Sequence, residues 1–192
     1  MSEGDSIILE ATRRRLTEKQ ADTVDKLTKA AVEVLAREGF AGMTIRMVAA
    51  AAGVGTATAY TYFSSKEHLV AEIFWRRLAA SPSPVSEDPD PKVRVVAELR
   101  NIAMLVADEQ QVSGAVTSAL LGRDPDVAHL RGRIGGEIRK RIVRALGPDA
   151  DDDVVESLEL LYAGALVRAG MGYGSYSEIA DRIEKSALLI LR

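Results

Sequence analysis

Apolar residues recur along this chain at spacings of three and four positions, on both sides of a proline-rich segment at residues 81–91. This spacing gathers them on one face of an α-helix, and the alternating β-branched pattern that indicates strands is missing. The pattern predicts an almost entirely helical protein. The apolar face of the first helix comprises Val24, Leu27, Ala31, Val34 and Leu35.

Capping residues and glycines set the expected limits of the first helices. Thr17 begins the first helix, with Gln20 as its capping-box partner, and Gly39 ends it. Thr44 caps a short second helix, which Gly53 terminates.

A further short helix begins near Thr56, and Ser64 with Glu67 has the capping-box spacing that starts the next one. The remaining helices are expected at residues 91–109, 112–121, 126–146, 151–171 and 176–191.

The two short helices around Gly53 have the composition of a helix-turn-helix. Small residues allow the two helices to pack closely, so that the second can enter the major groove of DNA. They are Ala49, Ala52, Gly53 and Ala57. The outward residues of the second helix can hydrogen-bond phosphates or base edges. They are Thr56, Thr58, Tyr60 and Thr61.

The segment at residues 81–91 holds four of the six prolines, and proline disfavours helix in the residue before it. We interpret it as an exposed connection between two domains. The expected division is a flexible N-terminal arm at residues 1–16, a helix-turn-helix domain at 17–80, the connection at 81–91 and a helical domain at 92–192.

Charge is distributed unevenly although the net value is only −3. Residues 1–80 hold 11 Lys or Arg and 10 Asp or Glu, whereas residues 81–192 hold 14 and 18. A non-specific nucleic-acid coat protein usually carries a basic excess, so the composition disfavours that class. No cysteine is present, which excludes disulfides and thiolate metal sites.

A set of residues in the N-terminal part resembles the tetracycline-repressor (TetR) family over about residues 20–75. They are Gly39-Phe40, Thr44-Ile45-Arg46-Met47-Val48-Ala49, Ala51-Ala52-Gly53-Val54, Thr58, Tyr60 and Tyr62-Phe63-Ser64-Ser65-Lys66-Glu67. The resemblance implies an all-α fold with an N-terminal three-helix helix-turn-helix domain and a larger C-terminal domain for ligand binding and dimerisation. It also implies a transcriptional regulator.

The resemblance assigns roles to individual side chains. Thr44 and Arg46 look like contacts at the start of the first motif helix, and Thr56 and Thr58 face the groove. Tyr60 and Tyr62 resemble the family's backbone-gripping aromatics, and Lys66 adds a cation at a helix N-terminus suited to phosphate.

The sequence departs from the family at Gly55-Thr56, where many members have Ser followed by Lys or Arg. The run Arg13-Arg14-Arg15 could replace the missing phosphate contact as a mobile arm. The alternative is a solvated charge run, which is what such runs usually are.

The resemblance further implies a homodimer joined through the last two long helices, and their apolar spacing suits a helix-helix seam. Some of these residues could instead pack within one subunit. The expected interface residues are Val155, Leu158, Tyr162, Ala165, Leu166, Ile179, Ile183 and Ala187.

The C-terminal domain is expected to hold a small-molecule effector of apolar character between its helices. Past residue 80 there is no Trp or Phe, which favours an aliphatic or flexible ligand. The candidate pocket residues are Met104, Leu105, Leu120, Leu121, Ile138, Tyr162 and Met171. The function implied is that of a cytoplasmic repressor released by its effector from a palindromic DNA operator.

Other chemistries have less support. His68 and His129 lie 61 residues apart without a nearby ligand triad, and Asp151-Asp152-Asp153 is better explained as a helix N-terminus than as a metal site. No metal, cofactor or membrane partner is expected. A small helical enzyme and a non-specific DNA-binding protein remain the alternative functions, but no nucleophile-elbow or phosphate-loop motif supports catalysis.

Overall fold

The computed structural model describes residues 18–83, 88–107 and 109–192. These residues form nine α-helices and no strand, so the all-α prediction is confirmed. The helices are α1 (Glu18–Gly42), α2 (Ile45–Ala51), α3 (Thr56–Tyr62), α4 (Lys66–Ala80), α5 (Pro91–Met104), α6 (Gln110–Leu121), α7 (Pro125–Leu146), α8 (Asp152–Gly170) and α9 (Tyr176–Ile190).

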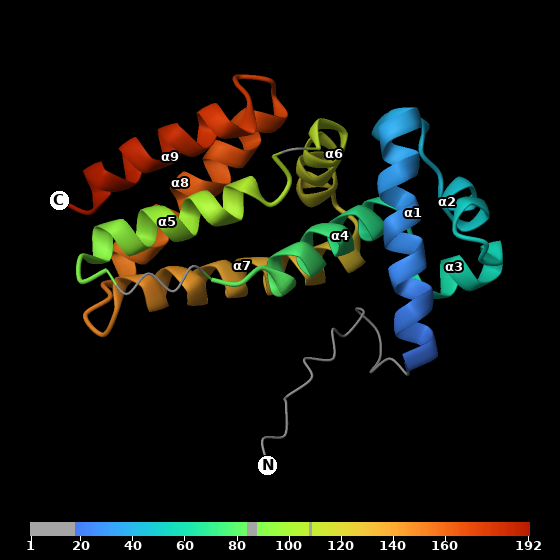
Figure 1. The fold of residues 1–192 in the computed structure, drawn as a ribbon, viewed down its shortest axis with the longest axis horizontal. Coiled ribbons are helices and arrows are strands. Elements are labelled where there is room, and N and C mark those ends of the chain that lie inside the picture. Colours follow the sequence, from blue (N-terminus) through green and yellow to red (C-terminus); the bar gives the residue numbers. More distant parts are fainter. Residues whose placement is uncertain (1–17, 84–87, 108) are drawn as a thin grey trace, which may run out of the picture.

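The helices are arranged along one long axis. Helices α2 and α3 lie beside α1 at one end, whereas α5, α8 and α9 lie at the other (Figure 1). Between these ends, α4 packs against α1 and also against α6 and α7. The helix that completes the N-terminal group is therefore also part of the packing of the second group.

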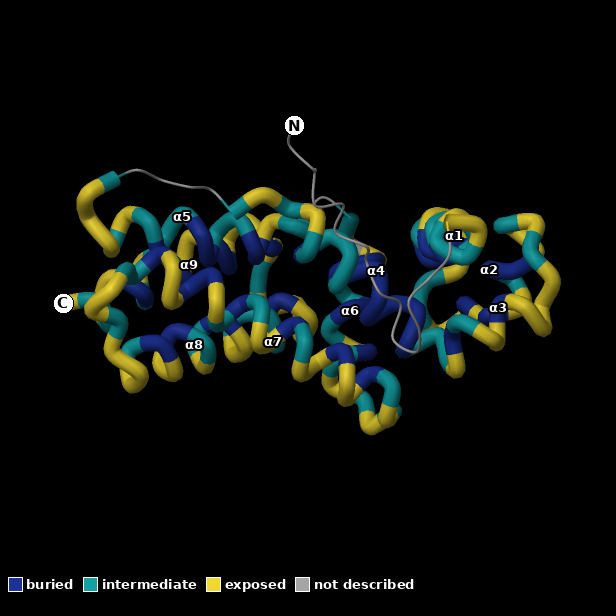
Figure 2. Tube along the Cα trace, turned by 90° about the horizontal axis from the view of Figure 1, so that it is seen from below, coloured by how far each residue is buried: buried dark blue, intermediate teal, exposed yellow. Residues whose placement is uncertain are grey.

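One cluster of buried apolar side chains runs through almost the whole molecule. It begins at Val24 of α1 and extends to Ala187 of α9. Exposed residues lie mainly on the outward faces of the helices, and buried residues follow the inward faces (Figure 2). This is the amphipathic arrangement that the three- and four-residue spacing predicts.

The start of α4 differs by one residue from the sequence prediction. Ser65, not Ser64, is the N-cap, and its Oγ accepts a hydrogen bond from the amide of His68 at 3.0 Å. Ser64 instead donates to Asp126 at 2.6 Å, and Ser65 donates to Asp124 at 2.7 Å. The turn between α3 and α4 is thus bound to the first residues of α7.

Helix α5 is shorter than the sequence prediction, because it ends at Met104 and not near residue 109. Residues 105–107 form a turn in which the amide of Ala107 donates to Met104 at 3.2 Å. The carbonyl of Leu105 accepts from the guanidinium of Arg77 at 3.2 Å. Arg77 of α4 thus supplies a hydrogen bond to a carbonyl that a further turn of α5 would otherwise satisfy.

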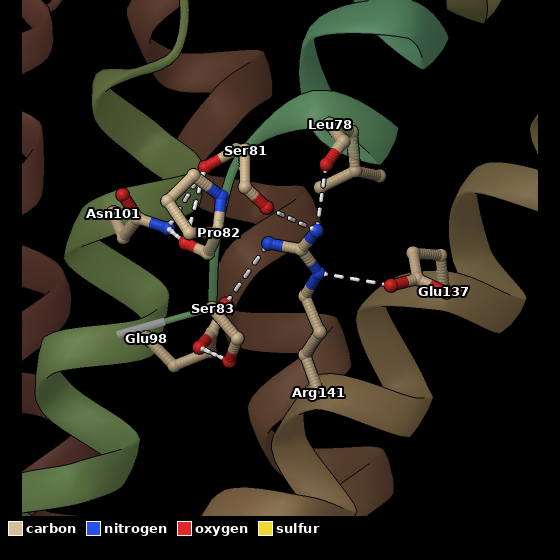
Figure 3. Close-up of polar contacts among 8 residues, drawn as sticks. All are labelled: Leu78, Ser81, Pro82, Ser83, Glu98, Asn101, Glu137 and Arg141. Carbon is tan, nitrogen blue, oxygen red and sulfur yellow. Dashed lines mark hydrogen bonds and ion pairs between the residues drawn. The ribbon is translucent and has the colours of Figure 1, made fainter. Parts of the chain in front are cut away.

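A buried arginine joins the end of α4 to α5 and α7 (Figure 3). Arg141 of α7 donates to the carbonyls of Leu78 at 2.6 Å and Ser81 at 3.0 Å. The same guanidinium lies 3.3 Å from Glu98 of α5 and 3.0 Å from Glu137 of α7. Carbonyls at a helix C-terminus lack intrahelical donors, and Arg141 supplies hydrogen-bond donors to two carbonyls at the end of α4.

Among the described residues, none of the helices combines the length and the apolar character needed to cross a bilayer.

Candidate nucleic-acid interface and internal pocket

The turn between α2 and α3 depends on one glycine. Gly53 has φ 64°, a left-handed conformation that side chains other than glycine rarely adopt. The turn closes by amide hydrogen bonds from Gly53 to Ala50 at 3.2 Å and from Val54 to Ala49 at 2.9 Å. Such a closed turn fixes the direction in which α3 leaves α2.

Helix α3 buries a single residue, Ala59, and exposes the opposite face. Thr56, Thr58, Tyr60 and Thr61 are all exposed there, as the sequence analysis expected. The hydroxyl of Thr61 donates to the carbonyl of Ala57 at 3.0 Å, so it offers DNA only an acceptor. Contacts between these side chains and DNA remain predictions.

Thr44 and Arg46 lie at the start of α2, and both are exposed. The Oγ1 atom of Thr44 accepts from the amide of Met47 at 3.3 Å, which makes Thr44 the N-cap. A hydroxyl that accepts in this way keeps its own hydrogen for a phosphate oxygen. The expected capping and the expected DNA contact are therefore compatible for this side chain.

The two tyrosines of α3 differ in their surroundings. Tyr60 is exposed, whereas Tyr62 is partly buried against the main core. Phe63, which follows Tyr62, is fully buried. Of the two, Tyr60 has the larger surface free for a DNA backbone.

Lys66 has a structural contact that the sequence analysis missed. Its Nζ atom donates to the carbonyls of Phe40 at 2.8 Å and Ala41 at 3.2 Å, and it lies 4.7 Å from the centre of the Phe40 ring. These contacts bind the start of α4 to the last turn of α1. Two of the three ammonium hydrogens are thus used within the protein, and the phosphate contact implied by the family resemblance remains a prediction.

We expect Lys66→Met to lower the free energy of unfolding by about 1–3 kcal/mol, because charge-assisted hydrogen bonds to two carbonyls are lost. Urea denaturation measures this loss. Lys29→Met is the matched control, since Lys29 is an exposed lysine paired with Asp25 one turn away. The unfolding midpoint of this variant should equal that of the parent chain. Unchanged stability of Lys66→Met, with equally weakened binding of every duplex, would instead identify Lys66 as mainly a phosphate contact.

A pocket of about 290 Å³ lies between α6, α7 and α8. Four of the predicted pocket residues line it: Leu120, Leu121, Ile138 and Tyr162. The other three, Met104, Leu105 and Met171, are absent from the wall of this pocket. Met104 and Met171 are exposed, and Leu105 lies in the turn after α5, where it packs on the core.

The sequence analysis also missed several residues of the pocket wall. They are Val116, Thr117, Arg131, Ile134, Gly135, Glu159, Ala163, Leu166 and Val167. Six of them lie three or four residues from Leu120, Leu121, Ile138 or Tyr162 on the same helices, so helical spacing was the signal that could have found these six: Val116, Thr117, Ile134, Gly135, Glu159 and Leu166.

The predicted dimer interface needs correction. Six of its residues are buried inside the single chain: Val155, Leu158, Tyr162, Ile179, Ile183 and Ala187. Ala165 and Leu166 are partly buried against the same core. An apolar helix stripe packs against whatever lies closest, and here α8 and α9 pack on each other and on the neighbouring helices.

The large apolar residues that α8 and α9 leave exposed lie elsewhere on these helices. They are Leu160 of α8, which is 67% exposed, with Leu188 and Leu189 of α9. Leu160 lies two residues after the buried Leu158, on a different face of α8. The sequence signal for this exposed surface was a large aliphatic residue, Leu160, outside the apolar stripe that faces the core.

The acidic cluster and His68 have structural roles. Asp151 caps α8 by accepting from the amides of Asp153 at 2.8 Å and Val154 at 3.2 Å, which confirms the capping interpretation. His68 is buried, and its Nδ1 atom accepts from the amide of Ser64 at 3.4 Å. Within residues 18–83, 88–107 and 109–192, no group of three His, Cys, Asp or Glu side chains is placed to hold a metal ion. The run Arg13-Arg14-Arg15 lies outside the described residues.

Known proteins match this chain in both its N-terminal and its C-terminal half. The family model of bacterial regulatory proteins of the tetR family matches residues 27–73. An HTH-type transcriptional regulator of Mycobacterium tuberculosis is 45% identical over 175 residues, which are 90% of this chain and 82% of that protein. A Mycobacterium bovis regulator of the same description has the same identity and coverage.

Solved structures share the fold. A TetR transcriptional regulator from Rhodococcus sp. RHA1 has a TM-score of 0.75 at 21% identity, covering 91% of this chain and 98% of that one. The regulator FadR from Bacillus subtilis, solved in complex with stearoyl-CoA, has a TM-score of 0.62 at 16% identity, covering 84% and 95%.

Proposed function

Since the chain belongs to the TetR family of bacterial transcriptional regulators, and is therefore a DNA-binding regulator, we propose that it is a homodimer that represses from a palindromic operator until an effector releases it. The observation that carries this proposal is the exposed face of α3. It presents Thr56, Thr58 and Tyr60 beyond the closed turn at Gly53.

Base recognition and positioning fall to different side chains. Thr58 lies near the middle of α3, where a hydroxyl and a methyl group can meet a base edge and a thymine methyl. Thr44, Arg46 and Tyr60 are also exposed and suit the phosphate backbone, which fixes the register without reading sequence. The N-terminal helices form the DNA-binding domain in this proposal, and residues 92–192 form the effector and dimer domain.

Dimerisation is assigned to the exposed apolar residues of α8 and α9, namely Leu160, Leu188 and Leu189. A two-fold dimer presents two copies of α3, which suits half-sites in successive major grooves about 34–36 Å apart. The operator is therefore expected to be an inverted repeat.

Effector release is assigned to the pocket between α6, α7 and α8. Helix α4, which follows the helix-turn-helix, packs on both α6 and α7. A ligand that favours one arrangement of these helices lowers DNA affinity by its difference in affinity for the two arrangements. We assign the pocket to binding and not to turnover, since regulators and not enzymes share this family.

Selection of random duplexes by the purified chain, followed by sequencing and a salt series, tests the proposal. We expect an enriched inverted repeat whose binding weakens as salt rises, because phosphate contacts release counterions. Equal binding of all duplexes would contradict specific recognition and favour the non-specific alternative. Enrichment of a site without symmetry would contradict the dimer.

Thr58→Ala should change which base is preferred at one position of each half-site, with a loss of about 1–3 kcal/mol of discrimination. The same selection measures this change. Ser118→Ala removes an exposed hydroxyl from α6, far along the chain from α3, and should leave the preference unchanged. A uniform loss of affinity in Thr58→Ala, without altered preference, would assign Thr58 to the backbone.

A further inference from the structure

The pocket between α6, α7 and α8 has two chemically different ends. Arg131 of α7 lines it beside the end of α6, and Ile138 lines it two turns farther along α7. Seven residues of α-helix span about 10 Å. Near Ile138, the wall residue Glu159 pairs with the guanidinium of Arg139 at 2.8 Å. The negative charge at that end is therefore already compensated within the protein.

Arg131 is the cation of the pocket wall, and no acid neutralises it. Its Nε atom donates to the carbonyl of Leu120 at 2.8 Å, and its Nη2 atom donates to that of Gly122 at 2.6 Å. Among the described residues, its acceptors are main-chain carbonyls and no carboxylate pairs with it. A guanidinium has five N–H groups, so these two bonds fix its position at the end of α6 and leave the other N–H groups for a ligand.

The charge lies at the solvent edge of the pocket. Arg131 is exposed, and the wall residue Leu121 is 63% exposed. The wall farther inside is mainly aliphatic and includes Val116, Ile134, Leu166 and Val167. A head group held by Arg131 stays in contact with water, whereas an attached alkyl chain meets an apolar surface. This division avoids the cost of burying a charge.

From these contacts we infer that the pocket binds a single-chain anionic amphiphile, a medium-chain carboxylate, with its alkyl chain between α6, α7 and α8 and its head group on Arg131. This inference rests on the proposed effector role of the pocket. An extended chain of about eight carbons matches the span from Arg131 to Ile138. The volume of about 290 Å³ is at the lower end of the roughly 300–1,000 Å³ typical of ligand pockets, which suits one short chain.

The test is calorimetric titration of the full chain with octanoate, octan-1-ol and octylammonium, which share the alkyl chain and differ in head group. A purely apolar groove would prefer octan-1-ol, because a carboxylate gives up hydration more reluctantly than a hydroxyl. We expect octanoate to bind at least about three-fold more tightly than octan-1-ol, and octylammonium to bind most weakly.

The salt dependence provides a second readout. Octanoate binding should weaken as salt rises, because an ion pair at the solvent edge is screened, whereas octan-1-ol binding should not weaken. Octan-1-ol or octylammonium binding as tightly as octanoate overturns the inference. The absence of saturable octanoate binding overturns it as well.

Arg131→Gln removes the charge and should abolish the preference for octanoate over octan-1-ol. Arg131→Lys keeps the charge and should keep part of that preference, whereas a purely structural role at the end of α6 would make the two variants alike. Arg123→Gln is the matched control, since Arg123 is an exposed arginine close to the same helix end but absent from the pocket wall. It should bind octanoate like the parent chain. An unchanged preference in Arg131→Gln overturns the role of Arg131.

Duplex selection on the same preparation separates this inference from the proposed function. An enriched inverted repeat without octanoate binding refutes the ligand class and leaves the DNA-binding proposal intact. Octanoate binding without any enrichment has the reverse meaning, because the pocket chemistry is then right and operator recognition is wrong.

Discussion

Arg141→Ala should lower the free energy of unfolding by about 3–5 kcal/mol, because it leaves the buried Glu98 carboxylate without its cation. The substitution also removes the donors to the carbonyls of Leu78 and Ser81 at the end of α4. Chemical denaturation followed by circular dichroism measures the loss. We expect the midpoint to fall, with the slope of the transition nearly unchanged.

Arg139→Ala on the same helix is the matched control. Arg139 pairs with Asp152 and Glu159 but is partly exposed, so its loss should cost less than about 1 kcal/mol. The double variant Arg141→Met with Glu98→Leu should recover part of the stability, since both buried charges are then absent. An effect of Arg141→Ala no larger than that of Arg139→Ala would show that the buried pair contributes little.

Leu160→Glu should dissociate the proposed dimer and weaken binding of the selected inverted repeat by at least about 100-fold, because two linked half-site contacts become two independent ones. Leu160 is exposed on α8, so a charge there leaves the fold of the subunit intact. Sedimentation equilibrium measures the mass, and a gel-shift titration measures the affinity.

Val93→Glu is the matched control, since Val93 is an exposed apolar residue of α5. It should remain dimeric and bind DNA like the parent chain. A dimeric Leu160→Glu with full affinity would place the interface elsewhere. Leu158 is unsuitable for this test because it is fully buried within one chain, and an acidic residue there would unfold the subunit.

Much of the fold could be predicted from sequence because the signals are local. The helical spacing predicts every helix of the described chain, and Thr44 and Asp151 form the caps that their side chains predict. The cap of α4 was misplaced by one residue because a distant residue decides it. Asp126, on α7, accepts the hydroxyl of Ser64, and Ser65 takes over the capping role.

The candidate site was predicted less completely, for two physical reasons. An apolar stripe such as that of Val155 and Leu158 indicates that one face of a helix is buried, but not which surface covers that face. Here the core of the same chain covers it. Pocket walls depend on how helices cross, so Met171 was assigned from composition although it lies exposed beyond the end of α8. Lys66 shows the same limit, since its carbonyl acceptors lie on another helix.

The two serine–aspartate hydrogen bonds at the turn between α3 and α4 link α7 directly to the N-terminal helices. Ser64 and Ser65, which follow α3 in the chain, join the end of that helix to the N-terminal end of α7. Farther along α7, Ile134 and Ile138 form part of the pocket wall. A helix of this length behaves as a stiff rod, so a tilt that a ligand imposes on its middle also swings its end. In the proposed effector response, a ligand in the pocket would thus move the end of α3 directly through α7, without the contacts of α4.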